Sequence, residues 1–171
     1  MRWDRLFGEL EGHAEHLRLE ERDVLVAELR QGEWAERTWL DGLAGDSAAI
    51  DISVRAVGVL TGRVRWVTEH TVCLEAAVGN HVIACAAVQW VRGVDRSPGL
   101  RRDSVRARLG WGPVFREAQD ERDDLTVTLL GGEALEGRVT AVGRDFVRLG
   151  SAAGRERDVP HAAIAMVTVH G

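Results

Sequence analysis

Hydrophobic and polar residues change their spacing near residue 50, and the change divides the chain into two parts. From Trp3 to Leu17, apolar residues recur at intervals of three and four, which is the period of an amphipathic helix. A second stretch from Leu19 to Leu43 continues this spacing, with Gly32 as its weak point. We therefore expect residues 1–46 to form two helices that pair as a hairpin.

From Ile50 onward, apolar and polar residues alternate in short runs punctuated by glycine, which is typical of strands and turns. Residues 50–91 and 125–167 have matching patterns and form an internal repeat. Most matched positions lie 75 residues apart, as Gly62 and Gly137 do, and one inserted residue shifts the last ones, such as Val91 and Val167. The later part of the chain is therefore predicted to contain one unit twice.

Each copy contains about five short strands, and a sheet that small hides its edges most readily by closing on itself. Gly62 and Gly137 lie within strands, where glycine often marks a sharp bend. We expect an α+β fold in which an N-terminal helical hairpin precedes two tandem five-stranded SH3-type β-barrels joined by a short helical connector. The expected parts are an acidic helical segment, a first barrel, a connector and a second barrel, over residues 1–46, 47–93, 94–123 and 124–171.

Two short helices are expected in the connector. Asp103 is a suitable N-cap for a helix over residues 104–109. Gly112-Pro113 is a suitable start for another, which would run to about Glu121, because proline is favoured at the first helical position.

The second copy resembles the Sm-like fold, a strongly bent five-stranded SH3-type barrel. The resemblance is carried by the strand pair around Gly131-Gly132, the turn over residues 143–149 that contains Asp145, and the short turn over residues 159–164. The first copy is similar but has His70 where Asp145 stands. The resemblance implies the fold of both copies and makes RNA a partner to consider.

The chain departs from Sm-like RNA binders at the positions that contact bases. Such proteins place an asparagine after the aspartate turn, where this chain has Cys73 and Arg148. They place an Arg-Gly pair in the final turn, where this chain has His161-Ala162. The whole chain also resembles a family of actinobacterial proteins that open with a Met-Arg-Trp-Asp-Arg-Leu-Phe type of start, some of them named as Fis family transcriptional regulators. No helix-turn-helix with a basic recognition helix is recognisable here, so that name carries little weight.

Charge is distributed unevenly along the chain. Residues 1–46 contain twelve acidic residues and six arginines, whereas residues 47–171 contain fifteen acidic residues and sixteen arginines. All 22 basic residues are arginine. The net charge of −5 lacks the basic surplus that proteins binding duplex DNA through its phosphates usually have.

The sequence predicts a cytoplasmic protein that does not interact with membranes. No apolar run approaches the length of about 20 residues that spans a bilayer, and residues 1–5 do not resemble a signal peptide. Cys73 and Cys85 are fewer than a secreted disulfide framework would need, so we expect buried thiols.

One candidate surface combines arginine with tryptophan on the first copy and the connector, a combination that can bind single-stranded nucleic acid or a protein partner. Its residues are Arg63, Arg65, Trp66, Arg101, Arg102, Arg106 and Trp111. We expect Trp3 and Trp90 to belong to the core instead.

No motif for catalysis, phosphate binding or dinucleotide binding is recognisable. We therefore expect no catalytic residues, no cofactor and no metal, and we interpret the chain as a non-enzymatic protein–protein interaction or scaffold module. A protein partner is expected, and self-association as a homodimer is left open. The alternative is a nucleic-acid-binding regulator that uses the arginine and tryptophan surface.

Overall fold

The computed structural model describes residues 32, 35, 37–43, 49–94 and 110–170. The chain divides into two compact units, residues 1–38 and 39–171, and all the described strands belong to the second unit. Among the described residues, no helix combines the length and the apolar character that a bilayer crossing requires.

Ten strands follow one another along the second unit. The first half of the sheet consists of β1 (Ile50–Val54), β2 (Gly58–Val67), β3 (Thr71–Ala76), β4 (Asn80–Ala84) and β5 (Val88–Arg92). The second half consists of β6 (Asp124–Leu129), β7 (Ala134–Val142), β8 (Phe146–Gly150), β9 (Glu156–Pro160) and β10 (Ile164–His170). The described helical elements are η1 (Asp41–Leu43), η2 (Cys85–Ala87), α2 (Trp111–Glu121) and η4 (His161–Ala163).

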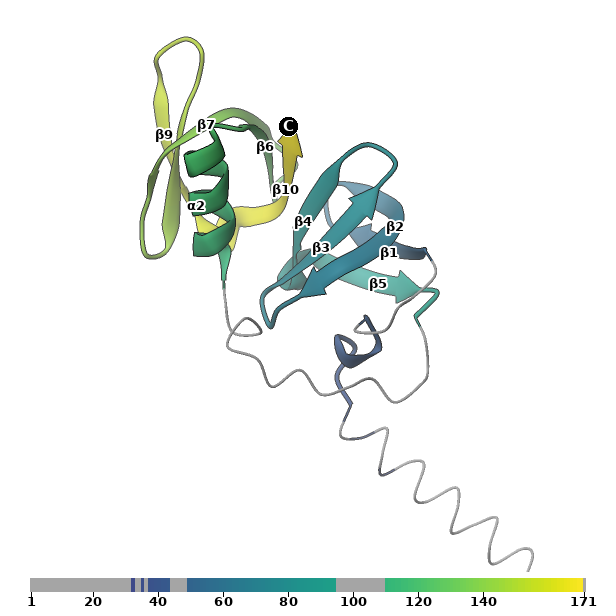
Figure 1. The fold of residues 1–171 in the computed structure, drawn as a ribbon. Helices are drawn as coiled ribbons and strands as arrows, with labels where there is room; N and C mark the ends of the chain where they lie inside the picture. Colours follow the sequence, from purple (N-terminus) through teal and green to yellow (C-terminus); the bar gives the residue numbers. More distant parts are fainter. Residues whose placement is uncertain (1–31, 33–34, 36, 44–48, 95–109, 171) are drawn as a thin grey trace, which may run out of the picture. The chain divides into compact units, whose positions relative to one another are not determined.

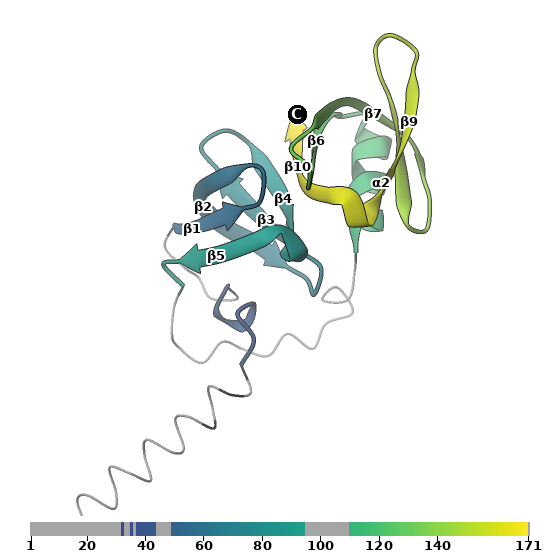
Figure 2. The same cartoon turned by 180° about the vertical axis from the view of Figure 1, so that it is seen from behind.

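The ten strands form one antiparallel sheet in the order β5-β1-β2-β3-β4-β10-β6-β7-β8-β9. Each half has the same internal order, in which its fifth strand pairs with its first and its fourth strand lies at the other end. The halves meet where β4 pairs with β10, for example Val82 with Val167 (Figures 1 and 2). The register also repeats, since Gly62 lies opposite Ile50 and Gly137 lies opposite Leu125.

The expectation of two separate five-stranded barrels is wrong. Neither half closes by pairing its fourth strand with its fifth, because β4 pairs with β10 instead. An edge strand can pair its free backbone groups with a strand of another sheet as well as within its own small sheet. Here one edge of each half is satisfied by the other half, so a single continuous sheet results.

Burial on both faces of the central strands explains why the continuous sheet is stable. Val72, Cys73 and Leu74 follow one another on β3, and all three are buried. Cys73 lies opposite Val82, and Val82 lies opposite Val167 in the second half, so these three side chains share one face of the sheet. Val72 points to the other face. Both faces of β3 are therefore covered in the continuous sheet.

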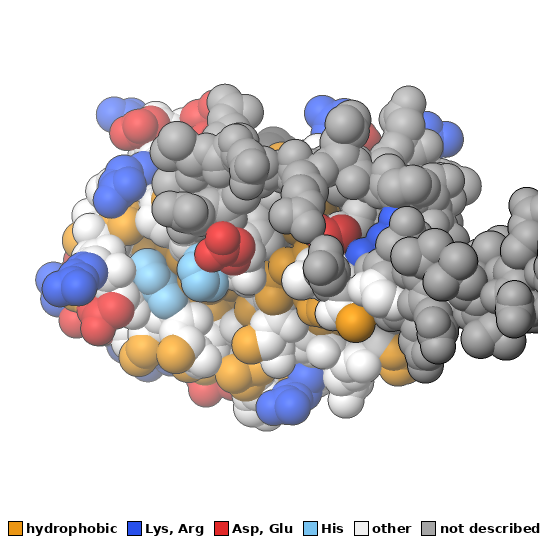
Figure 3. Space-filling model, turned by 90° about the horizontal axis from the view of Figure 1, so that it is seen from below, with side chains coloured by type: hydrophobic (Ala, Val, Ile, Leu, Met, Phe, Trp, Pro, Cys, Tyr) orange, Lys and Arg blue, Asp and Glu red, His pale blue; other side chains and the backbone are white. Residues whose placement is uncertain are grey.

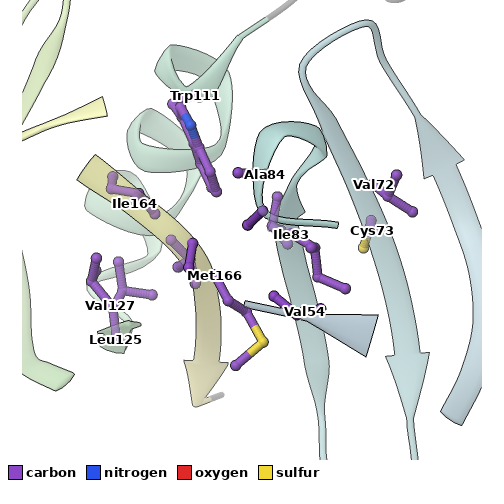
Figure 4. Close-up of a cluster of buried hydrophobic side chains, with 14 of the residues drawn as sticks. Val54, Val72, Cys73, Ile83, Ala84, Trp111, Leu125, Val127, Ile164 and Met166 are labelled. Carbon is purple, nitrogen blue, oxygen red and sulfur yellow. The ribbon is translucent and has the colours of Figure 1, made fainter. Parts of the chain in front are cut away.

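The core is shared across the junction between the two halves. Figure 4 shows Met166 on β10 between Ile83 of the first half and Val127 of the second. Met166 is directly opposite Ile83 and is almost completely buried. Leu43 of η1 also belongs to this core.

The predicted N-terminal helical hairpin falls largely outside the described residues. Those that are described contain one α-helix with defined bounds, α2, and no helical hairpin. The expectation of a helix that runs to Leu43 is wrong, because Asp41–Leu43 forms a 3₁₀ turn in which the Leu43 N–H donates to the Leu40 carbonyl. Trp39 is largely exposed whereas Leu43 is buried, so these two residues do not share the predicted apolar face.

Helix α2 covers part of the second half of the sheet. It begins at Trp111, two residues before the start that Pro113 predicts. Phe115 and Ala118 are buried, and Gln119 donates a hydrogen bond to the Thr140 carbonyl on β7 (Figure 1). The other expected connector helix, over residues 104–109, lies outside the described residues.

Candidate functional site

An outward-facing strip of side chains crosses β2, β1 and β5. Ser53 on β1 lies directly opposite Val59 on β2 and Trp90 on β5, and directly opposed residues of antiparallel strands share a face. Ile52 and Val54, the chain neighbours of Ser53, point into the core, so the strip lies on the outer face. Val59 and Trp90 are 55% and 46% exposed, while Ser53 between them is covered. We call these three residues the Val59–Trp90 strip.

A polar row borders this strip on the same three strands. Asp51 lies opposite Thr61 and Arg92, and it accepts hydrogen bonds from Thr61 Oγ1 at 2.7 Å and from Arg92 Nη2 at 2.6 Å. The hydrogen bond from Thr61, followed by that from Arg92, lowers the pKa of Asp51. The Arg92 guanidinium carbon also lies 6.0 Å from the centre of the Trp90 ring, at the outer limit of cation–π contact. The arginine therefore lies beside an indole that is about half exposed.

The two edge strands of the sheet differ in chemistry. β9 presents Glu156, Arg157 and Asp158 and ends at Pro160, and charges with proline are a common protection of sheet edges. Arg148 on the neighbouring β8 donates to both carboxylate oxygens of Asp158, at 2.6 and 2.9 Å.

On β5 the sequence is Val-Gln-Trp-Val-Arg, and its single charged residue, Arg92, is paired with Asp51. The β5 edge therefore lacks the charged residues and the proline of β9, and its one irregularity is the register shift against β1 between Ser53 and Val54.

The structure describes four of the seven arginine and tryptophan residues that the sequence grouped on one surface. Arg63 and Arg65 on β2 are exposed, but Arg65 Nη1 lies 3.5 Å from a carboxylate oxygen of Glu75, which stands directly opposite Arg63. Trp66 is partly buried against the core, opposite Cys73. Trp111 is buried on α2 and stacks on Phe115 with ring centres 5.6 Å apart.

Arg101, Arg102 and Arg106 lie outside the described residues. The face in Figure 3 shows acidic and arginine side chains interspersed with hydrophobic ones, and its described part has no continuous basic patch. The described part of the predicted surface thus contains two exposed arginines with an acid between them, and neither tryptophan is freely exposed.

Buried polar side chains connect the two halves of the sheet. His81 Nδ1 on β4 lies 3.0 Å from Thr168 Oγ1 on β10, and Thr168 stands opposite Thr126 on β6. Thr126 Oγ1 lies 2.8 Å from His170 Nε2. Burial, and to a lesser extent His170, lowers the pKa of His81, which keeps its ring neutral near pH 7. The row therefore helps to fix the register of β4 on β10.

A groove of about 750 Å³ opens on the second half, beside the β8–β9 loop. It contains the ion pair of Asp124 with Arg138, in which Arg138 Nε donates at 2.9 Å, together with Ser151, Arg155 and His170. Charges of both signs line it, so it does not define one class of ligand.

The two cysteines are free, and Cys73 is buried while Cys85 is partly so. Desolvation raises the pKa of each thiol to about 11, so both remain protonated at neutral pH. Within the described ranges, no group of three or more histidine, cysteine, aspartate or glutamate residues is arranged to hold a metal ion.

No protein-family model matches the chain, and no curated protein matches it either. The Sm-like and actinobacterial resemblances therefore stay predictions drawn from the quoted motifs.

The sequence did not predict that Val59 and Trp90 are exposed together on the outer face of the sheet. Trp90 was expected in the core, and Val59 was not singled out. The repeat partly indicates the strip, because the first copy has the larger apolar residue at both equivalent places: Trp90 corresponds to Met166, and Val59 corresponds to Ala134. Finding the strip also requires the knowledge that β10 is internal while β5 is an edge strand.

Proposed function

We propose that the protein is a non-enzymatic interaction or scaffold module that acts in the cytoplasm and binds a protein partner on the Val59–Trp90 strip. The observation that carries the proposal is the exposure of Val59 and Trp90 on either side of Ser53, on the outer face of the sheet. Tryptophan is enriched among the residues that contribute most to protein–protein binding. The ordered polar row of Asp51, Thr61 and Arg92 supplies the kind of rim that surrounds such contacts.

The corresponding strip in the second half supports this reading. Its residues are Ala134, Thr128 and Met166, which pair across β7, β6 and β10. Met166 there is covered because β4 lies beside it, and the exposed position is only an alanine. The first half has larger apolar side chains at the same places, and no strand of the described ranges pairs with its outer edge.

The groups that most often perform covalent and acid–base chemistry are in structural settings. Both thiols are protonated at neutral pH, and the His81 ring contacts Thr168 within the junction. The His161 ring stacks on Phe115 at 5.6 Å, and burial lowers its pKa. These contacts favour a binding role over an enzymatic one.

Retrieval of partners from the native cell extract, with nuclease present, tests the proposal. Val59→Glu should reduce the recovered partner at least tenfold, because a charge in the centre of an apolar contact must be desolvated. Val78→Glu is the matched control, since Val78 is 80% exposed in the β3–β4 turn and away from the strip.

Equal recovery by the two variants would contradict the proposal. Tight, salt-sensitive binding of the purified chain to single-stranded RNA or duplex DNA would instead favour the nucleic-acid regulator.

A further inference from the structure

We infer that two copies of this chain associate through β5, edge to edge and antiparallel, around a two-fold axis that passes beside Trp90. The inference deepens the proposed function, on which it rests, by naming a second copy of the chain as the molecule that covers the open edge of the strip. It follows from the unequal edges of the sheet, from the repeat and from the symmetry of a five-residue strand.

The unequal edges determine which strands can meet. A sheet with two free edges can extend through β5 with β9, β9 with β9, or β5 with β5. Both arrangements that use β9 would place another strand against Glu156, Arg157 and Asp158, and Pro160 lacks the N–H that a ladder needs. Pairing β5 with β5 avoids all four residues.

The pairing of β4 with β10 shows how a neighbouring strand buries the residue equivalent to Trp90. Trp90 corresponds to Met166 in the repeat, and Met166 is buried because Ile83 of β4 lies directly opposite it. Trp90 has Ser53 on one side, and among the described residues no strand lies on the other. A second β5 would supply the missing neighbour, with backbone hydrogen bonds as well as apolar contact.

The strand is suited to pairing with itself. β5 runs from Val88 to Arg92, so full antiparallel overlap around a two-fold axis places Trp90 opposite Trp90 of the second copy. Aromatic cross-strand pairs are among the stabilising ones. Val88 of each copy then stands opposite Arg92 of the other, so no two arginines are opposed. The Val59–Trp90 strips of the two copies also join into one outer surface.

Light scattering on the purified full-length chain tests the inference. At about 100 µM chain the wild type should have twice the mass of one chain and should dissociate on dilution, as mass action requires. Trp90→Glu and Trp90→Lys should each be monomeric at that concentration, because each places two like charges opposite one another. Val78→Glu and Val78→Lys, at an exposed site away from the edge, should remain dimeric.

Mixing the two variants tests the two-fold arrangement itself. Trp90→Glu mixed with Trp90→Lys should form a mixed dimer, because position 90 then carries opposite charges in the two copies. Recovery of the dimer also shows that both variants are folded. A monomeric wild type, a dimer that survives in both variants, or a mixture that stays monomeric would overturn the inference.

The partner assay separates this inference from the proposed function. Val59 lies on β2, two strands in from the β5 edge, so Val59→Glu should remain dimeric while it loses its partner. A monomeric wild type that still loses its partner through Val59→Glu would overturn the dimer and leave the function standing. A dimeric protein whose partner recovery is unaffected by Val59→Glu would overturn the proposed function and leave the dimer standing.

Discussion

Gly62 on β2 and Gly137 on β7 occupy the same place in the two halves of the sheet, close to the backbone of a neighbouring strand. A β-carbon on Gly62 would collide with the carbonyl oxygen of Glu75, and one on Gly137 would collide with that of Gly150. Because both obstacles are backbone atoms of a paired strand, they cannot move without disturbing the ladder. Glycine is therefore required here by close approach.

Gly137→Ala should destabilise the protein by about 1–3 kcal/mol, the usual cost of an added group in a well-packed place. Urea denaturation followed by circular dichroism measures the change. Gly131→Ala is the control, because a β-carbon there meets nothing within 4 Å. A loss in Gly131→Ala equal to that in Gly137→Ala would contradict this account of the bend.

His81 links stability to pH. Its folded-state pKa is lowered, mainly by burial, from the ordinary value of 6.5, so the unfolded chain binds a proton more readily than the folded one. Stability should therefore be complete above pH 6.5 and should fall as the pH drops through and below that value. His161 has a lowered pKa for the same reason and adds to the loss.

His81→Gln isolates the contribution of the junction, since the amide can still hydrogen-bond to Thr168 but cannot be protonated. The melting temperature, measured from pH 7.5 to pH 5, should fall less steeply in His81→Gln than in the wild type. His70→Gln, an exposed histidine on the β2–β3 turn, is the control and should follow the wild type. Identical slopes in all three proteins would show that His81 does not carry the effect.

Among the elements, the strand pattern was the more predictable feature and the pairing the less predictable one. Alternation and glycine spacing predicted five strands in each copy, because these signals act within a few residues. The partner of a fourth strand depends on long-range contacts. Trp90 and Met166 illustrate the limit, since equivalent residues become exposed and buried according to whether β4 lies beside them.

The candidate site was less predictable than the fold. Arg63 is exposed, but its acidic neighbour Glu75 becomes adjacent only through the β2–β3 register, which the sequence does not give. Trp111 lies in the connector sequence, yet it is buried on α2. Sequence spacing does not report such packing.

Ile83→Ala tests whether the two halves behave as one element. The substitution removes a buried side chain from the junction and should cost about 2–5 kcal/mol. Because β4 and β10 share one core, amide hydrogen exchange should accelerate in β6 and β7 of the second half as well as in β3. Acceleration confined to the first half would show that the halves are energetically independent.

At the scale of the whole molecule, the charges on β9 limit how far the sheet can grow. An ion pair as exposed as Arg148–Asp158 contributes little to stability, so we expect its main effect to be on association. With both edges open, copies could pair head to tail through β5 and β9, and such contacts do not close.

Replacing Arg157 and Asp158 together by valine should therefore leave the melting temperature nearly unchanged but produce large, polydisperse assemblies, measurable by dynamic light scattering. Arg63→Val with Glu75→Val, which removes an equal number of charges from an interior strand pair, should not do so. Assemblies in the control but not in the β9 variant would contradict the role assigned to this edge.

Because β4 pairs with β10, the two halves have contacts of their own besides the peptide chain that links them. A polypeptide that ends at Val94 and another that begins at Gly110 would each contain five complete strands, and each would present the edge that the other requires. The molecule is thus a natural candidate for fragment complementation, in which a signal appears only when both pieces are made in the same cell.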